Sequence, residues 1–256
     1  MSKVPAYSRP PVREALIDVR INPLSADKLG VLESLHDKLA IKYPGKRPQQ
    51  KWEGMWELKE NTLLSAQKTH GVVGFSLESE DKKRIIQYRL DGFTCNYLKP
   101  DHRESWPGWT DLRGEAKLAW DLYATTLGVT ETKRLAVRYV NQIVIPASVV
   151  ELNDYLTAPP NAPKECKYQD FHDFLSRVTL DIPELKSKAI ITQAPAQEKP
   201  QGAVVVLLDI DVICSESIAY DSESMWHMLD RFREIKNDIF EASLHQKAKD
   251  LFGPIQ

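Results

Sequence analysis

The sequence is poor in cysteine and has none of the spacings typical of metal or redox sites. Its cysteines are few, odd in number and far apart, at Cys95, Cys166 and Cys214. No Cys-x-x-Cys pair occurs, and the histidines form neither His-x-His nor His-Glu-x-x-His. Zinc sites and disulfide frameworks are recognised by such spacings. We therefore expect reduced, structural cysteines in a cytoplasmic protein, with no zinc and no other cofactor.

Long hydrophobic runs are absent as well. The longest solid apolar stretch is Ala203–Leu208, whereas a membrane-spanning helix needs about 20 such residues. The first residues, MSKVPAYSRPPVREALIDVR, lack the apolar core of a secretory signal peptide. We therefore expect no membrane association.

An excess of charge of one sign is also missing, as are the common catalytic signatures. The chain carries 34 Lys and Arg against 36 Asp and Glu, so its net charge does not favour nucleic acid or an anionic membrane. No Gly-x-Ser-x-Gly nucleophile motif, phosphate-binding loop or dinucleotide fingerprint is present. These absences favour a protein without catalysis of its own.

The first half of the chain has a regular pattern of apolar residues. Residues 12–21 alternate apolar and polar side chains, which predicts a half-buried strand. A helix is predicted next, with Ser25 or Asp27 as N-cap and leucines at helical spacing. Aromatic and β-branched segments separated by polar turns then predict antiparallel strands, in 51–58, 61–67, 71–79 and 83–99. A second helix is predicted over 109–127.

The second half repeats this order. Residues 133–146 predict a strand and 149–156 a short helix. Further strands are expected in 172–183, 187–196 and 202–214, followed by a long helix over 224–251. We therefore predict an α+β protein of two tandem β-α-β(3–4)-α units, 1–130 and 131–256, with antiparallel sheet and helices on one face. The alternative is one irregular α+β domain, and the units could form one sheet or two.

Charged residues should gather on the sheet face that the helices leave open. Asp209 and Asp211 are two positions apart and therefore share a strand face. By the same rule, Arg134 shares a face with Arg138, and Asp18 with Arg20. One interpretation is a solvated face of paired charges. Another is a groove whose arginines bind phosphate or carboxylate, with these candidate residues: Arg20, Arg89, Arg134, Arg138 and Asn141. A metal site on Asp209 and Asp211 is the fallback.

Three segments carry a resemblance to a known family. They are RPPVREALIDVRI near the start, LAVRYVNQIVIP in the middle and IFEASLHQKAKDLFG near the end. Together they resemble a sporadically distributed prokaryotic family of uncharacterised proteins of about this length. Its patchy distribution resembles that of accessory genes such as toxin–antitoxin or anti-phage defence modules. The resemblance brings no catalytic residues, and the matching positions are Pro11, Glu14, Arg138, Tyr139, Asn141, Phe240, Glu241, Ser243 and Gly253.

The function predicted from the sequence is therefore that of a non-enzymatic interaction protein. Its partner would be a protein, encoded nearby in a defence or toxin operon, and one contact surface would be the charged side of the last helix. The first alternative is a nucleic-acid- or nucleotide-binding protein that uses the arginines of the open sheet face. The second alternative is a metal-dependent enzyme with Asp209 and Asp211. No feature of the sequence indicates the oligomeric state.

Overall fold

A single antiparallel sheet of nine strands forms the body of the protein. The computed structural model describes residues 6–59, 62–99, 106–147, 150–171, 173–197, 199–219 and 222–255. The strand order is β3-β4-β5-β6-β2-β8-β11-β10-β9, and each neighbouring pair is antiparallel. The strands are β2 (Val12–Arg20), β3 (Gly45–Lys59), β4 (Thr62–Glu78), β5 (Arg84–Arg89), β6 (Gly92–Leu98), β8 (Arg134–Ile145), β9 (Ser176–Ile182), β10 (Ser187–Pro195) and β11 (Val204–Cys214).

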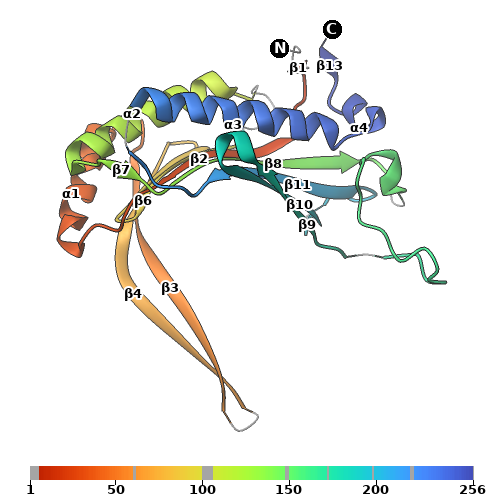
Figure 1. Ribbon diagram of the computed structural model, residues 1–256, viewed down its shortest axis with the longest axis horizontal. Helices are drawn as coiled ribbons and strands as arrows, with labels where there is room; N and C mark the ends of the chain where they lie inside the picture. Colours follow the sequence, from red (N-terminus) through yellow and green to blue (C-terminus); the bar gives the residue numbers. More distant parts are fainter. Residues whose placement is uncertain are drawn as a thin grey trace.

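Two long helices lie side by side on one face of this sheet (Figure 1). The first, α2 (Trp109–Leu127), packs on β6 and β2, and the second, α3 (Ser222–Ala242), packs on β8 and β11. A polar link joins them, because the Trp109 indole and the Arg113 guanidinium both donate to Asp230 at 2.8 Å. The opposite side of the sheet is called the open face below. The architecture is α+β, with antiparallel sheet and both long helices on one face, as predicted.

Short elements complete the chain. Helix α1 (Leu29–Ser34) lies between two 3-10 turns, and α4 (Gln246–Asp250) follows α3. Near the chain ends, β1 (Ala6–Tyr7) pairs with β13 (Pro254–Ile255), which brings the two ends of the described chain together (Figure 1). The remaining elements are the 3-10 turns Ala26–Lys28, Leu35–Lys38, Leu152–Asp154 and Pro183–Leu185 and the small pair β7 (Glu131–Thr132) with β12 (Ile218–Ala219).

The apolar and polar sides of the sheet follow from strand alternation. Side chains two positions apart share a face, so one apolar set of each strand points to the helices. In the central strand β2, Ala15, Ile17 and Val19 are fully buried on the helix side. In β11, the set made of Val206, Leu208, Ile210 and Val212 is buried in the same way. The core is therefore a layer between the sheet and the two helices.

Several predicted elements have different bounds in the structure. The helix over 109–127 is confirmed as α2. The helix predicted over 224–251 is interrupted, because α3 ends at Ala242 and α4 begins only at Gln246. Between them, the backbone of Ser243–His245 bonds to Tyr155–Thr157, with His245 N–H donating to Tyr155 C=O at 2.9 Å. This tertiary pairing replaces the hydrogen bonds of a continuing helix.

Three strand predictions also change, and the first is 83–99, which forms the two strands β5 and β6. The segments 61–67 and 71–79, predicted as separate strands, form the single strand β4. The strand predicted over 172–183 begins only at Ser176, and His172 lies outside the described residues. The helix predicted over 149–156 is reduced to the 3-10 turn Leu152–Asp154, and Val149 lies outside the described residues.

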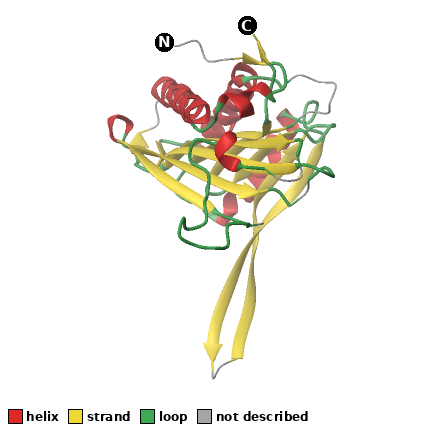
Figure 2. Ribbon diagram, turned by 90° about the vertical axis from the view of Figure 1, so that its right-hand side faces the viewer, coloured by secondary structure: helices red, strands yellow, loops and turns green. Residues whose placement is uncertain are grey.

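A long hairpin extends from the sheet. Strands β3 and β4 pair along their whole length, but β5 joins β4 only over Gly74–Glu78. The backbone of 51–59 and 62–70 therefore pairs only with itself. Figures 1 and 2 show this part as a two-stranded arm that projects from the side of the sheet opposite α2 and α3. We call residues 51–70 the arm.

The packing of β11 leads to a first prediction. Leu208 is fully buried between the sheet and the helices, so Leu208→Ala should lower the free energy of unfolding by about 2–5 kcal/mol. Leu118 on α2 is 71% exposed, so Leu118→Ala should change it by less than about 0.5 kcal/mol. Urea unfolding of both variants checks this. Equal effects of the two substitutions would contradict the burial pattern.

Candidate functional site

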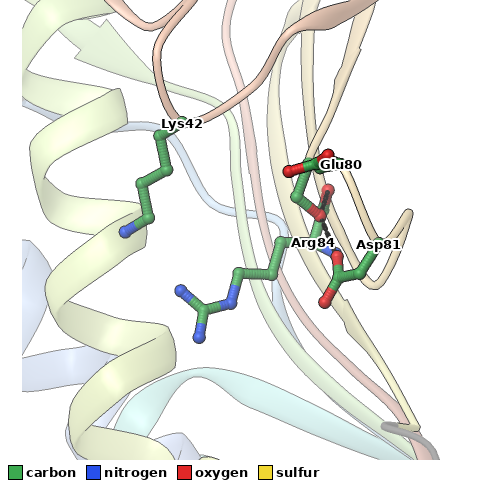
Figure 3. A pocket seen from close by; sticks show the side chains of 5 residues that line it. Lys42, Glu80, Asp81 and Arg84 are labelled. Atoms are coloured by element: carbon green, nitrogen blue, oxygen red, sulfur yellow. Dashed lines mark hydrogen bonds between the residues drawn. The ribbon is translucent and has the colours of Figure 1, made fainter.

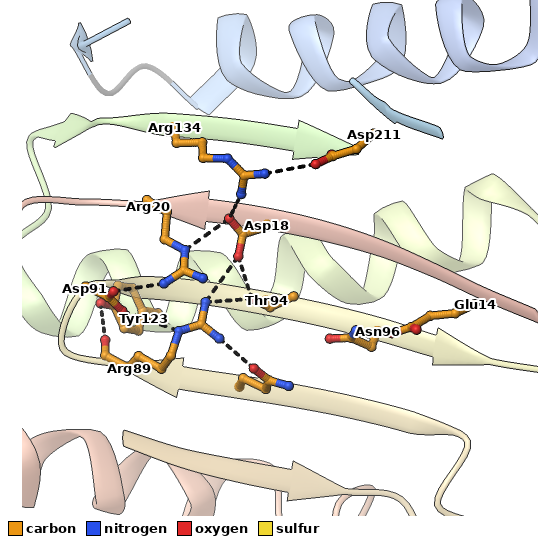
Figure 4. A network of polar contacts seen from close by, with 11 residues as sticks. Glu14, Asp18, Arg20, Arg89, Asp91, Thr94, Asn96, Tyr123, Arg134 and Asp211 are labelled. Carbon is orange, nitrogen blue, oxygen red and sulfur yellow. Dashed lines mark hydrogen bonds and ion pairs between the residues drawn. The ribbon is translucent and has the colours of Figure 1, made fainter. Parts of the chain in front are cut away.

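A network of charged side chains covers the centre of the open face (Figure 4). Its hub is Asp18 of β2, whose side chain is only 6% exposed. The Asp18 carboxylate accepts from Arg20 at 3.1 Å and from Arg89 at 3.2 Å, and it also pairs with Arg134. Thr94 donates to the same carboxylate at 2.8 Å. Four neighbouring strands therefore meet at one acidic group.

Arg89 of β5 is the most enclosed guanidinium of the network. It donates to Gln87 at 2.6 Å and to Thr94 at 2.7 Å, in addition to Asp18. Asp91, in the turn after β5, lies 3.4 Å from it and also accepts from Arg20 at 2.9 Å. Burial, and then the neighbouring positive charge of Arg20, lower the pKa of Arg89. The site therefore holds two adjacent cations only because Asp18 and Asp91 lie between them.

On β8 and β11, the network continues as two further ion pairs. Arg138 donates two parallel hydrogen bonds of 2.8 and 2.6 Å to the Asp209 carboxylate, the bidentate geometry that a guanidinium group favours. Arg134 donates to Asp211 at 3.2 Å. Burial raises the pKa of Asp211, whose other carboxylate oxygen has no hydrogen-bond partner among the described residues. Both aspartates therefore lie on the open face, paired with arginine.

The charges of this network balance. Four arginines, Arg20, Arg89, Arg134 and Arg138, face four aspartates, Asp18, Asp91, Asp209 and Asp211. A phosphate or carboxylate ligand would have to displace one of these carboxylates. Arg138 is the most exposed of the four arginines, with 44% of its side chain open to solvent. It is therefore the arginine that could most readily exchange its partner.

The structure separates Asn141 from this set. Asn141 follows the alternation of Tyr139 and Ile143 in β8, so it lies on the helix side of the sheet and is 2% exposed. Its side-chain amide donates to the backbone C=O of Leu208 at 3.1 Å. The grouping of Asn141 with Arg138 as one ligand site is therefore wrong, because residues an odd number of positions apart in a strand face opposite sides.

The fallback metal site receives no support from the geometry. Within the described ranges, no group of three or more His, Cys, Asp or Glu side chains is placed to hold a metal ion. Asp209 and Asp211 are directed to arginines, and hard cations prefer several converging carboxylates. The described cysteines Cys95, Cys166 and Cys214 are all free thiols.

A second cluster of charges, which the sequence did not reveal, lies beside α2. A hollow of about 460 Å³ is lined by Lys42, Ser79, Glu80, Asp81 and Arg84 (Figure 3). Two of these residues contact Glu115 of α2, whose side chain is 8% exposed: Lys42 forms an ion pair with it, and Arg84 lies 3.9 Å from it. These residues come from three distant segments, so no local pattern predicts them. Because Glu80 and Asp81 also line the hollow, it is no simple anion site.

A buried lysine lies on the helix side of the sheet. Lys236 of α3 is 7% exposed, and its ammonium group lies 3.8 Å from the ring centroid of Tyr139. Burial, and then the charge of Arg233, lower the pKa of Lys236 to about 7, while Glu241 acts in the opposite direction. A face of an aromatic ring offers only partial compensation for lost hydration. The burial of Lys236 between α3 and the sheet therefore lowers the stability of the folded protein.

The positions that carry the family resemblance near the chain end have structural contacts. Glu241 accepts from the Tyr7 hydroxyl at 2.9 Å, and Phe240 packs edge-on against Tyr7 with ring centroids 6.4 Å apart. Gly253 has a φ of 65°, and a Cβ there would lie 2.4 Å from the Ser8 hydroxyl oxygen. These contacts hold the last residues of the chain against the segment of Tyr7 and Ser8. A packing role therefore accounts for Phe240, Glu241 and Gly253.

Comparison with known proteins gives no relative from which a function could be transferred. No family model, no curated protein and no solved structure matches the chain. None of the helices in the described part of the chain is both long and apolar enough to cross a membrane.

Removal of the hub carboxylate tests the network. Asp18→Asn leaves Arg20, Arg89 and Arg134 close together without their shared anion, so the free energy of unfolding should fall by about 2–4 kcal/mol. Asp209→Asn changes one partly exposed pair and should cost about 1 kcal/mol or less. Chemical denaturation measures both values. A smaller loss for Asp18→Asn than for Asp209→Asn would contradict the assignment of Asp18 as hub.

The lowered pKa of Lys236 predicts a pH-dependent stability. Between about pH 7 and the ordinary lysine value, the unfolded chain holds one proton that the folded chain lacks. Stability should therefore rise with pH in this window, by at most about 1.4 kcal/mol per pH unit from this group. Lys236→Met lacks this contribution. The free energy of unfolding of the variant minus that of the wild type should therefore decrease from pH 7 to pH 9. Parallel pH profiles in urea unfolding would show that Lys236 is not the titrating group.

Proposed function

We propose that the protein is a non-enzymatic interaction protein whose main contact element is the β3–β4 arm. The observation that carries this proposal is the projection of the arm from the body, with backbone pairing only between its own two strands (Figure 2). An isolated two-stranded hairpin is at best marginally stable in water. A partner that packs against both strands of the arm would therefore stabilise it.

The amino-acid sequence of the arm supports a protein as this partner. It includes Trp52, Met55 and Trp56 on β3 and Leu63 and Leu64 on β4. Tryptophan and methionine are enriched at the centres of protein–protein interfaces, where they bury large apolar areas. A nucleic-acid-binding arm would instead need many basic residues around its aromatic ones.

The balanced open face argues in the same direction. Nucleic-acid or nucleotide binding through Arg20, Arg89, Arg134 and Arg138 remains the alternative function, with the bidentate fork of Arg138 as its best-placed contact. Each arginine already pairs with an aspartate, however, so a phosphate would gain little net attraction. A protein partner needs no such exchange.

The setting of the protein is part of the same proposal. The resemblance to a patchily distributed prokaryotic family supports a role as accessory component of a toxin–antitoxin or anti-phage module in the cytoplasm. Its partner would then be encoded beside it. Sequencing of the neighbouring genes supplies the first candidates for direct binding measurements.

The order of the strands supports an origin from two tandem units, 1–130 and 131–256. Within the nine-stranded sheet, the first strand of each half (β2 or β8) pairs with the last strand of that half (β6 or β11). The remaining strands of each half then follow outward as a meander. The pair β2–β8 joins the halves. In this interpretation, the arm is an elongation of one hairpin in the first unit.

Deletion of the arm tests the proposed function. Gln50 and Val72 are partners in register, so an Asn-Gly turn can join them directly in place of 51–71. We expect this variant to keep the melting temperature of the wild type within a few degrees, because the deleted backbone pairs only with itself. In affinity capture from the source cells, the amount of at least one protein encoded nearby should be lower with the arm deletion than with the wild type, by about tenfold or more.

Arg138→Ala is the matched control, because it alters the open face and leaves the arm intact. It should retain the captured protein, and titration with the purified partner should give the wild-type affinity. The alternative function predicts the reverse. Oligonucleotide binding that weakens steeply with salt and is lost in Arg138→Ala, together with unchanged capture by the arm deletion, would overturn the proposal.

A further inference from the structure

Strand β9 forms an unprotected edge of the sheet. It pairs with β10 on one side, and no other described strand pairs with it. The five residues from Arg177 to Asp181 are all exposed. An edge strand presents a row of unpaired backbone N–H and C=O groups that can accept another strand. The strand SRVTLDI contains no proline or glycine, the residues that most often prevent such pairing.

The other edge of the sheet is built differently. Strand β3 contains Pro48, and its register with β4 shifts at Gln49, Gln50 and Lys51. Proline and bulges at an edge disfavour the addition of a further strand. Only the β9 edge therefore combines a regular, exposed backbone with the absence of these devices among the described strands.

The sequence of β9 is complementary to itself when read in the opposite direction. Thr179 lies at its centre, with Val178 and Leu180 on either side and Arg177 and Asp181 beyond them. In an antiparallel pair of two copies centred on Thr179, Arg177 of each copy lies opposite Asp181 of the other. Val178 of each copy likewise lies opposite Leu180. Opposite charges and aliphatic side chains at directly facing positions are the pairs that stabilise antiparallel strands.

The two faces of the sheet also match in this register. By its pairing with β10, β9 directs Val178 and Leu180 to the helix side, where they are 49% and 41% exposed. Helix α3 packs on β8 and β11 and leaves them uncovered. Arg177 and Asp181 point to the open face, where the nearest oppositely charged group to Asp181 among the described residues is Lys188, at 4.0 Å. A second copy would cover the aliphatic pair and supply the missing charges.

We propose that two copies of this chain associate through their β9 strands, antiparallel and centred on Thr179, into a twofold-symmetric dimer with one continuous sheet. A twofold interface requires one surface patch to complement itself, and the palindromic order of charge and hydrophobicity in β9 meets this requirement. The proposal is independent of the proposed function of the arm.

Charge reversal at the two ends of β9 tests both the association and its register. Sedimentation of the full chain between about 1 and 200 µM should give twice the mass of one chain, 29.2 kDa, as concentration rises. R177D and D181R each place like charges opposite one another twice, and each should raise the dissociation constant by about tenfold or more. The double variant R177D/D181R restores opposite charges and should dimerise like the wild type.

A mixture of the two single variants gives the sharpest result. The R177D chain carries acidic residues at both positions and the D181R chain basic residues at both, so together they should form a heterodimer although each alone is a monomer. K247D is the matched control, because it reverses an exposed charge on α4, outside the proposed interface, and should leave dimerisation unchanged. All variants should keep the wild-type melting temperature, since the altered side chains are exposed.

Three outcomes would overturn the proposal. A wild-type chain that stays monomeric over the whole range would leave the β9 edge to a strand of another protein. A dimer that survives both single reversals would place the interface elsewhere. Single variants that become monomers, but fail to recombine in the mixture, would exclude the register centred on Thr179.

Discussion

The pairing of β2 with β8 is the constraint on which the rest of the structure depends. Among the described strands it is the only pairing that joins β3–β6 to β9–β11, and it fixes which side chains face the helices. In its register Arg20 lies directly opposite Arg134, an arrangement of like charges that is destabilising by itself. Asp18 accepts from both guanidinium groups and thereby makes this register tolerable. A shift by one residue would bring Asp18 into the apolar core, so the same carboxylate also opposes the wrong pairing.

The charge network therefore has a structural origin, and this limits what the open face can bind. Each guanidinium fork is already occupied by a carboxylate of a neighbouring strand, and Arg89 is largely enclosed. Binding of a free anion would require an arginine to exchange one carboxylate for another acceptor, with little net gain of Coulomb energy at the protein surface. Only Arg138, bound to a single aspartate and nearly half exposed, could do so without opening the hub.

Local patterns were sufficient where strand or helix periodicity alone decides the outcome. The alternation of 12–21 predicted the apolar set that is buried in β2, and the stripe of 109–127 predicted α2. The rest depended on pairing between distant segments. The break after Ala242 results from backbone bonds to Tyr155 and Thr157, and the partner of each arginine follows from strand order, which the sequence pattern leaves open. The position of Asn141 in the alternation of β8 already indicates the helix side, but its polar side chain led to the wrong prediction that it lies on the open face with Arg138.

The arginines of the open face are paired with aspartates, and α2 and α3 cover the helix side of the four strands β6, β2, β8 and β11. The strand order places the β3–β4 arm at one end and β9 at the other. A twofold pair through β9 would therefore carry its two arms at opposite ends of one continuous sheet and present two identical contact elements. Two linked sites of this kind raise the apparent affinity for a partner that is itself repeated or dimeric, without any new contact. The same strand order that pairs each arginine of the open face with an aspartate would thus make the proposed dimer bivalent.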